Sequence, residues 1–289
     1  MNTATVVNGS PAEVSARAHH LPAAALAVVA VGLLLGLPEA LGMEGRLTAV
    51  LVLQLGLVGS WVLVTGIQGF SGSIAVGAVG AAAADLLLLL PKRPSLGGLL
   101  AVLGVGFLAV VVQQMLRRPR TDLVASLSGG VLMLCGVCAL AVFLLIGASL
   151  TGPRPPMAAV LAAGVALVAG HLVDTAVPRP QLTPEVPRGA LALLVAVAAG
   201  AATGLLARSG SGLPGTLLPV FSGAAVGAVA ALVGLAASYV VVEAARGEDL
   251  RGADDASPAM RRWALPVLQV TAPLAACAPV TFALLLLAA

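Results

Sequence analysis

The chain has 289 residues, of which 60% are hydrophobic and 9% charged, and its mean hydropathy is +1.08. Soluble domains have about 45–50% apolar and about 25% charged residues, so the composition excludes that class and indicates an integral membrane protein. A net charge of +3 is too small to suggest a nucleic-acid partner, and three cysteines do not make a disulfide framework.

The chain opens with a polar stretch, residues 1–19, that is typical of a disordered cytoplasmic arm. The first apolar run, residues 21–37, is near the lower length limit for a span. A cleaved signal peptide is the alternative, because Ala40, Leu41 and Gly42 form a small-residue cleavage site. The long arm with a single arginine favours an uncleaved span.

Further apolar runs follow along the chain, and most are long enough to cross a hydrocarbon core of about 30 Å. They cover residues 47–66, 73–90, 95–116, 123–150, 157–177, 189–207, 217–242 and 263–287. The runs lack the alternation of outer-membrane strands, so helices are required. We predict an all-α polytopic bundle of about nine spans, in a single transmembrane domain over residues 20–289.

The distribution of basic residues predicts the orientation of the bundle. Ten of the 15 Lys and Arg residues lie in segments on the side of the N-terminus and five on the other side. Because cytoplasmic loops carry the excess of basic residues, the N-terminus is predicted to be cytoplasmic. The bias towards Ala, Gly, Val, Leu and Arg is typical of a GC-rich genome and suggests the plasma membrane of a bacterium.

Ionisable residues inside the predicted spans are the first candidates for function. Asp85 lies in the span 73–90, while His171 and Asp174 lie near the end of the span 157–177. No Lys or Arg occurs inside any predicted span, so Asp85 has no evident ion-pair partner. It either lies near the interface, where it is hydrated, or faces the interior of the bundle.

His171 and Asp174 are three residues apart and therefore share one face of a helix. A divalent ion would need further ligands, and Glu243 and Asp249 are the candidates on the same side of the membrane. The simpler interpretation is a polar helix end that reaches towards water.

Arginines on the cytoplasmic side are predicted to contact lipid headgroups, since each favours an anionic surface by roughly 1 kcal/mol. They are Arg117, Arg118, Arg120, Arg188, Arg261 and Arg262. The same residues also serve as topology signals.

Two short patterns have simple structural interpretations. Small residues recur four apart at Gly32 and Gly36, at Ala196, Gly200 and Gly204, and at Gly223, Gly227 and Ala231, a spacing that lets helices approach closely. Cys135 and Cys138 have the spacing of a redox dithiol, but no basic residue nearby would activate a thiol. We interpret these cysteines as small core residues.

Several segments resemble the bacterial CDP-diacylglycerol synthases, also called phosphatidate cytidylyltransferases. The segments are His20 to Ala24, Arg120 to Ala125, Asp174-Thr175 with a proline-rich loop that ends at Pro187-Arg188, and Ala278 to Leu284. The resemblance implies a CTP-dependent transferase of phosphatidate that uses Mg²⁺, with Asp174 as a catalytic carboxylate. The Gly-His-Gly-Gly and Asp-Arg elements of that family are absent, so the resemblance implies an inactive paralogue.

Three hypotheses follow. The first is a non-catalytic plasma-membrane protein without a cofactor, associated with membrane lipids and with an envelope protein or a second copy of the chain. The second is an active lipid-headgroup cytidylyltransferase that uses Asp174 with Glu243, the carboxylates of residues 248–255 and Mg²⁺. The third is a small-solute or proton-coupled permease with Asp85 and Asp174 along its path.

Overall fold

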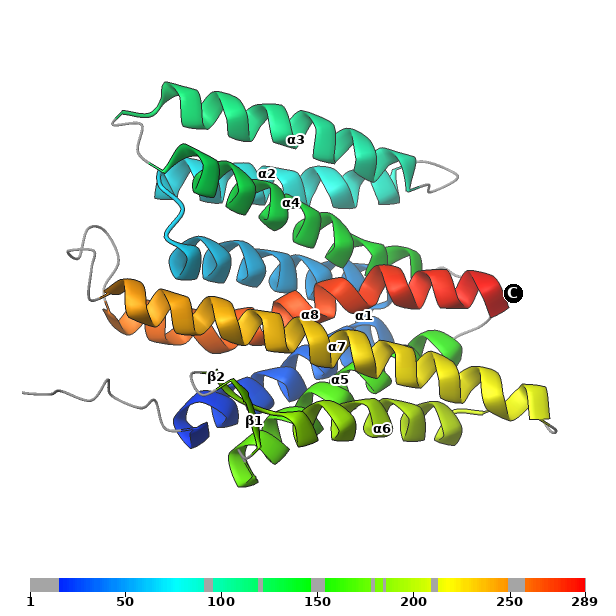
Figure 1. Cartoon of the computed structure of the whole chain (residues 1–289). Helices are drawn as coiled ribbons and strands as arrows, with labels where there is room; N and C mark the ends of the chain where they lie inside the picture. Colours follow the sequence, from blue (N-terminus) through cyan, green and yellow to red (C-terminus); the bar gives the residue numbers. More distant parts are fainter. Residues whose placement is uncertain are drawn as a thin grey trace, which may run out of the picture.

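The chain forms an elongated bundle of helices that run back and forth along a common direction (Figure 1). The computed structural model describes residues 16–90, 96–118, 122–146, 154–177, 180–183, 186–208, 213–248 and 258–288. The helices are α1 (Ala16–Thr65), α2 (Phe70–Leu89), α3 (Gly97–Leu116), α4 (Leu123–Ile146), α5 (Arg154–Ala176), α6 (Ala190–Leu206), α7 (Leu213–Glu248) and α8 (Pro258–Ala288). Of the predicted arm, residues 16–19 belong to α1 and the others lie outside the described part.

Helix α1 is divided by Gly42, whose φ of 63° and ψ of −131° are not helical. Glycine lacks a Cβ and adopts such positive φ values without strain. A side chain at Gly45 would collide with the carbonyl oxygen of Leu37, which shows how tightly the chain turns there. The halves before and after Gly42 run in opposite directions (Figure 1). They correspond to the predicted spans 21–37 and 47–66.

In the described part of the chain the structure is all-α apart from one hairpin, and seven helices are long and apolar enough to cross a membrane. Helix α1 counts once among the seven, and α6 is a shorter apolar helix. These findings agree with a multi-pass helical membrane protein.

The segment after α5, which we described from the sequence as a proline-rich loop, contains a short antiparallel hairpin. Strand β1 (Gln181–Thr183) pairs with β2 (Val186–Gly189), with an irregularity in the register. The backbone N–H of Ala190 also donates to the carbonyl of Pro180 over 3.1 Å. The hairpin leads directly into α6, so it holds the start of α6 near the end of α5.

Helix α4 is the most enclosed of the candidate membrane-spanning helices, because 72% of its 18-residue apolar stretch is buried inside the bundle. In contrast, α3 lies at one edge of the bundle and α6 at the opposite edge (Figure 1). Many exposed apolar side chains remain on these edge helices, among them Leu100, Leu108 and Leu194. Exposed apolar surface of this extent is expected where a helix faces lipid instead of water.

The small-residue pattern in α6 and α7 produces a close contact between the two backbones. A Cβ built on Gly200 would collide with the carbonyl of Gly223, and one on Gly227 would lie 2.7 Å from the carbonyl of Ala196. A Cβ built on Gly204 would collide with the backbone carbonyl of Pro219. The prediction of close packing is therefore confirmed for this pair of helices. Gly32 and Gly36 have nothing within 4 Å of such a Cβ among the described residues.

A cluster of amide side chains joins the short turn after α1 to α3. Gln113 Nε2 donates to the carbonyl of Gly69, and Gln114 Nε2 donates to the carbonyl of Gln68, over 3.2 and 3.1 Å. Arg117 Nη1 donates to Gln68 Oε1 over 3.3 Å. These bonds satisfy backbone carbonyls at a turn between two apolar helices, which would otherwise cost free energy.

We expect Gly223→Ala and Gly36→Ala to change stability in opposite directions. Alanine normally stabilises a helix by about 0.5–1 kcal/mol relative to glycine, and Gly36 has room for the added methyl group. At Gly223 the methyl group meets backbone atoms of α6 and forces the helices apart, at a cost of about 1–3 kcal/mol. Titration with dodecyl sulfate in mixed micelles measures the free energy of unfolding. Equal effects of the two substitutions would contradict the close contact.

Candidate functional site

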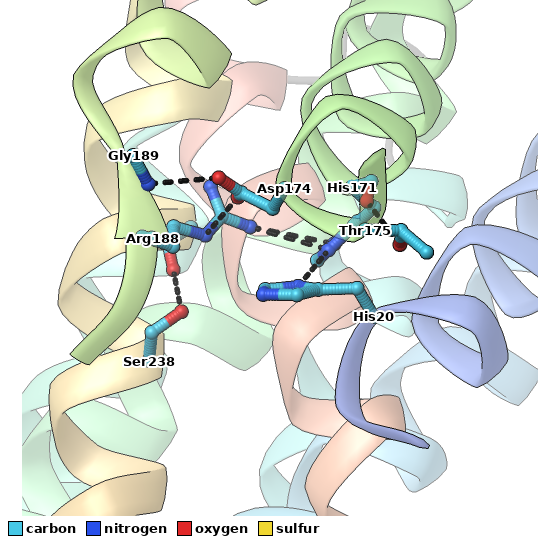
Figure 2. Close-up of polar contacts among 8 residues, drawn as sticks. His20, His171, Asp174, Thr175, Arg188, Gly189 and Ser238 are labelled. Carbon is cyan, nitrogen blue, oxygen red and sulfur yellow. Dashed lines mark hydrogen bonds and ion pairs between the residues drawn. The ribbon is translucent and has the colours of Figure 1, made fainter. Parts of the chain in front are cut away.

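The candidate site lies where the end of α5 meets the hairpin, the start of α1 and the middle of α7 (Figure 2). His171 and Asp174 are on the last turns of α5, on the shared face that their spacing predicts. Both side chains are fully buried. The hydroxyl of Thr175 donates back to the carbonyl of His171 over 2.8 Å, so it is part of the helix itself.

The carboxylate of Asp174 is bound by groups of the hairpin. Its Oδ1 accepts a hydrogen bond from the backbone N–H of Gly189 over 2.8 Å. Its Oδ2 lies 3.7 Å from Nε of Arg188, which is an ion pair but too long for a hydrogen bond. Asp174 therefore fixes the last two residues of β2 against α5.

Arg188 does not lie at a lipid headgroup, where we had predicted it, because its side chain points into the bundle and is only 2% exposed. The guanidinium rests against α7 at Gly234, where a Cβ would lie 2.8 Å from Nη1 and 3.0 Å from Nη2. Burial lowers the pKa of Arg188, and the charge of Asp174 partly opposes that shift. Because the pKa of arginine is ordinarily far above 7, the guanidinium remains charged.

Two histidines complete the cluster. Nδ1 of His20, from the start of α1, lies 3.1 Å from Nδ1 of His171, and both rings are fully buried. One of these atoms must carry the hydrogen and the other must accept it. Nη2 of Arg188 lies 3.5 and 3.4 Å from the two ring nitrogens of His171. Both ring nitrogens are within hydrogen-bonding distance of Nη2, so the tautomer of His171 decides which of them accepts from Arg188.

Among the described side chains of the cluster, the fixed positive and negative charges are equal in number. A neutral histidine pair leaves one guanidinium and one carboxylate, which face each other across 3.7 Å. Protonation of both histidines would add two positive charges beside the guanidinium, at distances where like charges repel strongly. Ser238 on α7 is fully buried nearby, and its hydroxyl donates to the carbonyl of Gly234 over 2.9 Å. The arrangement can hold a proton between two imidazoles and can anchor the hairpin.

The structure separates several of the residues that we predicted to act together. Glu243, on α7, is exposed, whereas Asp174 is buried, and Asp249 lies outside the described residues. Among the side chains that the structure describes, no three metal-ligating groups come together. Asp85 is 2% exposed and lies on α2, in a separate polar cluster with Gln54.

The remaining arginines have different surroundings. Arg118 is exposed at the end of α3, and Arg117 is partly buried and bonded to Gln68. Arg120 and the side chains of Arg261 and Arg262 lie outside the described part of the chain. Cys135 and Cys138 are free cysteines, as is Cys277.

Sequence reasoning missed three contributors to the site. His20 was noted only for a family resemblance, and the N–H of Gly189 and the space at Gly234 were not considered. A signal existed for His20, because it lies at the same predicted membrane side as His171. The sequence contained no comparable signal for Gly234, because apolar runs do not show which helices will become neighbours.

The fold and the site together define a multi-pass helical membrane protein with a buried cluster of charged and polar side chains at one end of its bundle. The chain matches no family model, no curated protein and no solved structure.

We expect Asp174→Ala to destabilise the protein by about 3–5 kcal/mol, because it leaves a buried guanidinium without its carboxylate. Adding Arg188→Met should restore most of the loss, since the apolar side chain removes the uncompensated charge. Glu44→Ala, at an exposed carboxylate, is the matched control and should stay within about 0.5 kcal/mol. Unfolding in mixed micelles measures the wild type, both single variants Asp174→Ala and Arg188→Met, the double variant and the control. Additive losses in the double variant would show that the pair is not coupled.

Proposed function

We propose that this chain is a non-catalytic, multi-pass protein of a bacterial plasma membrane that associates with lipid. The observation that carries the proposal is that the carboxylate of Asp174 is inaccessible. This group is fully buried and is occupied by Gly189 and Arg188 of the same chain. A metal-dependent transferase needs this carboxylate to be available to an ion and its phosphate ligands.

The resemblance to the phosphatidate cytidylyltransferases fits the same proposal. Arg188 ends the proline-rich loop that follows Asp174-Thr175, and in this chain it turns inward to pair with Asp174. The pairing would replace a catalytic role by a structural one, as expected of an inactive paralogue. No cofactor is then needed, and Mg²⁺ enters only if catalysis remains.

We further propose nine membrane crossings. Helix α1 provides two, because its 46-residue segment His20–Thr65 would extend about 69 Å at 1.5 Å per residue, more than twice the hydrocarbon core of about 30 Å. Gly42 turns the chain back within this segment. Helix α6, with 17 residues, reaches about 26 Å and is near the lower limit for a span. The remaining candidates supply six more crossings. The excess of basic residues on the N-terminal side supports a cytoplasmic N-terminus.

Lipid association is supported by Arg118, which is exposed at the predicted cytoplasmic end of α3. The neighbouring Arg117 is bonded to Gln68 and helps to hold this end of the helix in place. An envelope protein or a second copy of the chain are further partners that we propose. Co-purification from the native membrane would identify either.

Reporter fusions test the proposed topology. A fluorescent protein fused after Glu248 should fold and fluoresce, because that site is predicted to be cytoplasmic. Alkaline phosphatase fused after Ala289 should be active, because an odd number of crossings places that end outside. As a control, the two reporters are exchanged. Alkaline phosphatase after Glu248 should then be inactive, and the fluorescent protein after Ala289 should not fluoresce. Activity of alkaline phosphatase at both sites would contradict the orientation and the odd number of crossings.

Native mass spectrometry tests the lipid association. Arg118→Gln should lower the affinity for an anionic lipid such as phosphatidylglycerol about fivefold, which corresponds to roughly 1 kcal/mol per arginine at a headgroup. Arg208→Gln is the matched control, because Arg208 is exposed at the opposite end of the bundle. Equal effects of the two substitutions would contradict a specific contact at the cytoplasmic side.

The same purified protein should bind no CTP in the presence of magnesium and should not incorporate CTP into phosphatidate. Magnesium-dependent binding that is lost in Asp174→Asn would overturn the non-catalytic proposal in favour of the transferase. The asparagine variant retains the volume of the side chain, so a loss of binding would not be explained by a cavity.

A further inference from the structure

A second buried carboxylate lies away from the Asp174 cluster, where three helices meet. Asp85 on α2 is 2% exposed and Gln54 on α1 is fully buried. Gln54 Nε2 donates to Asp85 Oδ1 over 3.0 Å and to the carbonyl of Val137 on α4 over 3.2 Å. The amide therefore bridges α2 and α4 from α1.

No cation faces Asp85 among the described residues. The helices packed against α2 are α1, α3 and α4. Helix α3 contains no titratable residue, and α4 contains only Cys135 and Cys138. The half of α1 after Leu47 contains none, and Arg46 precedes Gln54 by eight residues, or about 12 Å along the helix. The other ionisable residues of this part of α1 are Glu39 and Glu44, which are exposed in the region around Gly42.

An ionised Asp85 would thus be a buried charge without a counter-ion, which costs several kcal/mol. The described residues leave two polar atoms of this pair without a hydrogen-bond partner, Asp85 Oδ2 and Gln54 Oε1. If Asp85 is a carboxylate, both atoms are acceptors and neither can satisfy the other. If Asp85 carries a proton, Oδ2 becomes a donor and Gln54 offers the free acceptor.

We propose that Asp85 and Gln54 form a buried proton-binding site in which Asp85 holds the proton on Oδ2. Gln54 orients the acid by donating to Oδ1 and accepts from the protonated oxygen. The proposal goes beyond the lipid-associated role and does not depend on it. A carboxyl group kept neutral inside a membrane is also the element that a proton-coupled transport step would use.

The assignment of the Gln54 amide favours a proton over a metal ion. Its nitrogen lies between two acceptors, Asp85 Oδ1 and the Val137 carbonyl, where an oxygen would be repelled. A sodium ion needs several oxygen ligands and would require the amide to be turned round. Release of the proton would leave the charge uncompensated, so it requires water or a cation to reach α2.

Infrared spectroscopy of the protein in nanodiscs tests the proposal directly. At pH 8 an ordinary aspartic acid, with a pKa of about 3.9, is ionised and has no acid C=O stretching band. We expect the wild-type protein to show such a band, Asp85→Asn to lose it and Gln54→Leu to shift it. Asp122→Asn, at an exposed aspartate, is the matched control and should leave the band unchanged. Absence of the band, or its persistence in Asp85→Asn, would overturn the proposal.

Thermal unfolding distinguishes a proton from a sodium ion. Because asparagine is neutral and can also donate to Gln54, Asp85→Asn should unfold within about 2 °C of the wild type, a shift expected for a few tenths of a kcal/mol. Neither protein should be stabilised by sodium chloride relative to choline chloride. Stabilisation by sodium that is lost in Asp85→Asn would overturn the proposal in favour of a cation site. If Asp85→Asn does not fold, the band shift in Gln54→Leu decides the matter.

Discussion

The ion pair between Asp174 and Arg188 is the contact on which the polar end of the bundle depends. A guanidinium in an apolar interior requires a carboxylate and close packing around it, since either charge alone would cost several kcal/mol. Asp174 provides the charge, and the absent side chain at Gly234 provides the space. The hairpin is therefore held against α5 by the ion pair with Asp174, and against α7 by the packing of the guanidinium on Gly234.

The space at Gly234 depends in turn on how α6 and α7 pack. Helix α6 begins directly after β2, so its position sets where Arg188 lies relative to α7. Gly200 and Gly223 bring the two backbones into contact, and Gly227 continues the contact one turn further. In lipid there is no hydrophobic force between helices, so such close van der Waals contact is a main source of association. The small-residue pattern and the charged cluster are thus parts of one arrangement.

The two buried carboxylates among the described residues have different partners. Asp174 faces a cation supplied by the hairpin, whereas the partner of Asp85 is the neutral amide of Gln54. A fixed cation gives a permanent structural contact. A neutral amide leaves the charge to be supplied from outside the chain, and a proton is the smallest species that can do so. The Asp174 cluster is for this reason suited to hold structure, and the Asp85 pair to bind.

The sequence by itself determined the class of the protein and the placement of its polar residues along the chain. Continuous apolar runs in a medium without water permit only helices, so the all-α character and most helix positions followed from composition. The faces of small residues on α6 and α7 were readable from spacing alone, but the spacing did not show that these two helices meet. Only the tertiary structure decided that Arg188 turns inward, that His20 meets His171 and that Gln54 meets Asp85. His20 and His171 are 151 residues apart, and the other two contacts join elements close together in the chain whose facing sides were not fixed by the sequence. Apolar faces of similar composition do not encode which neighbour they will meet.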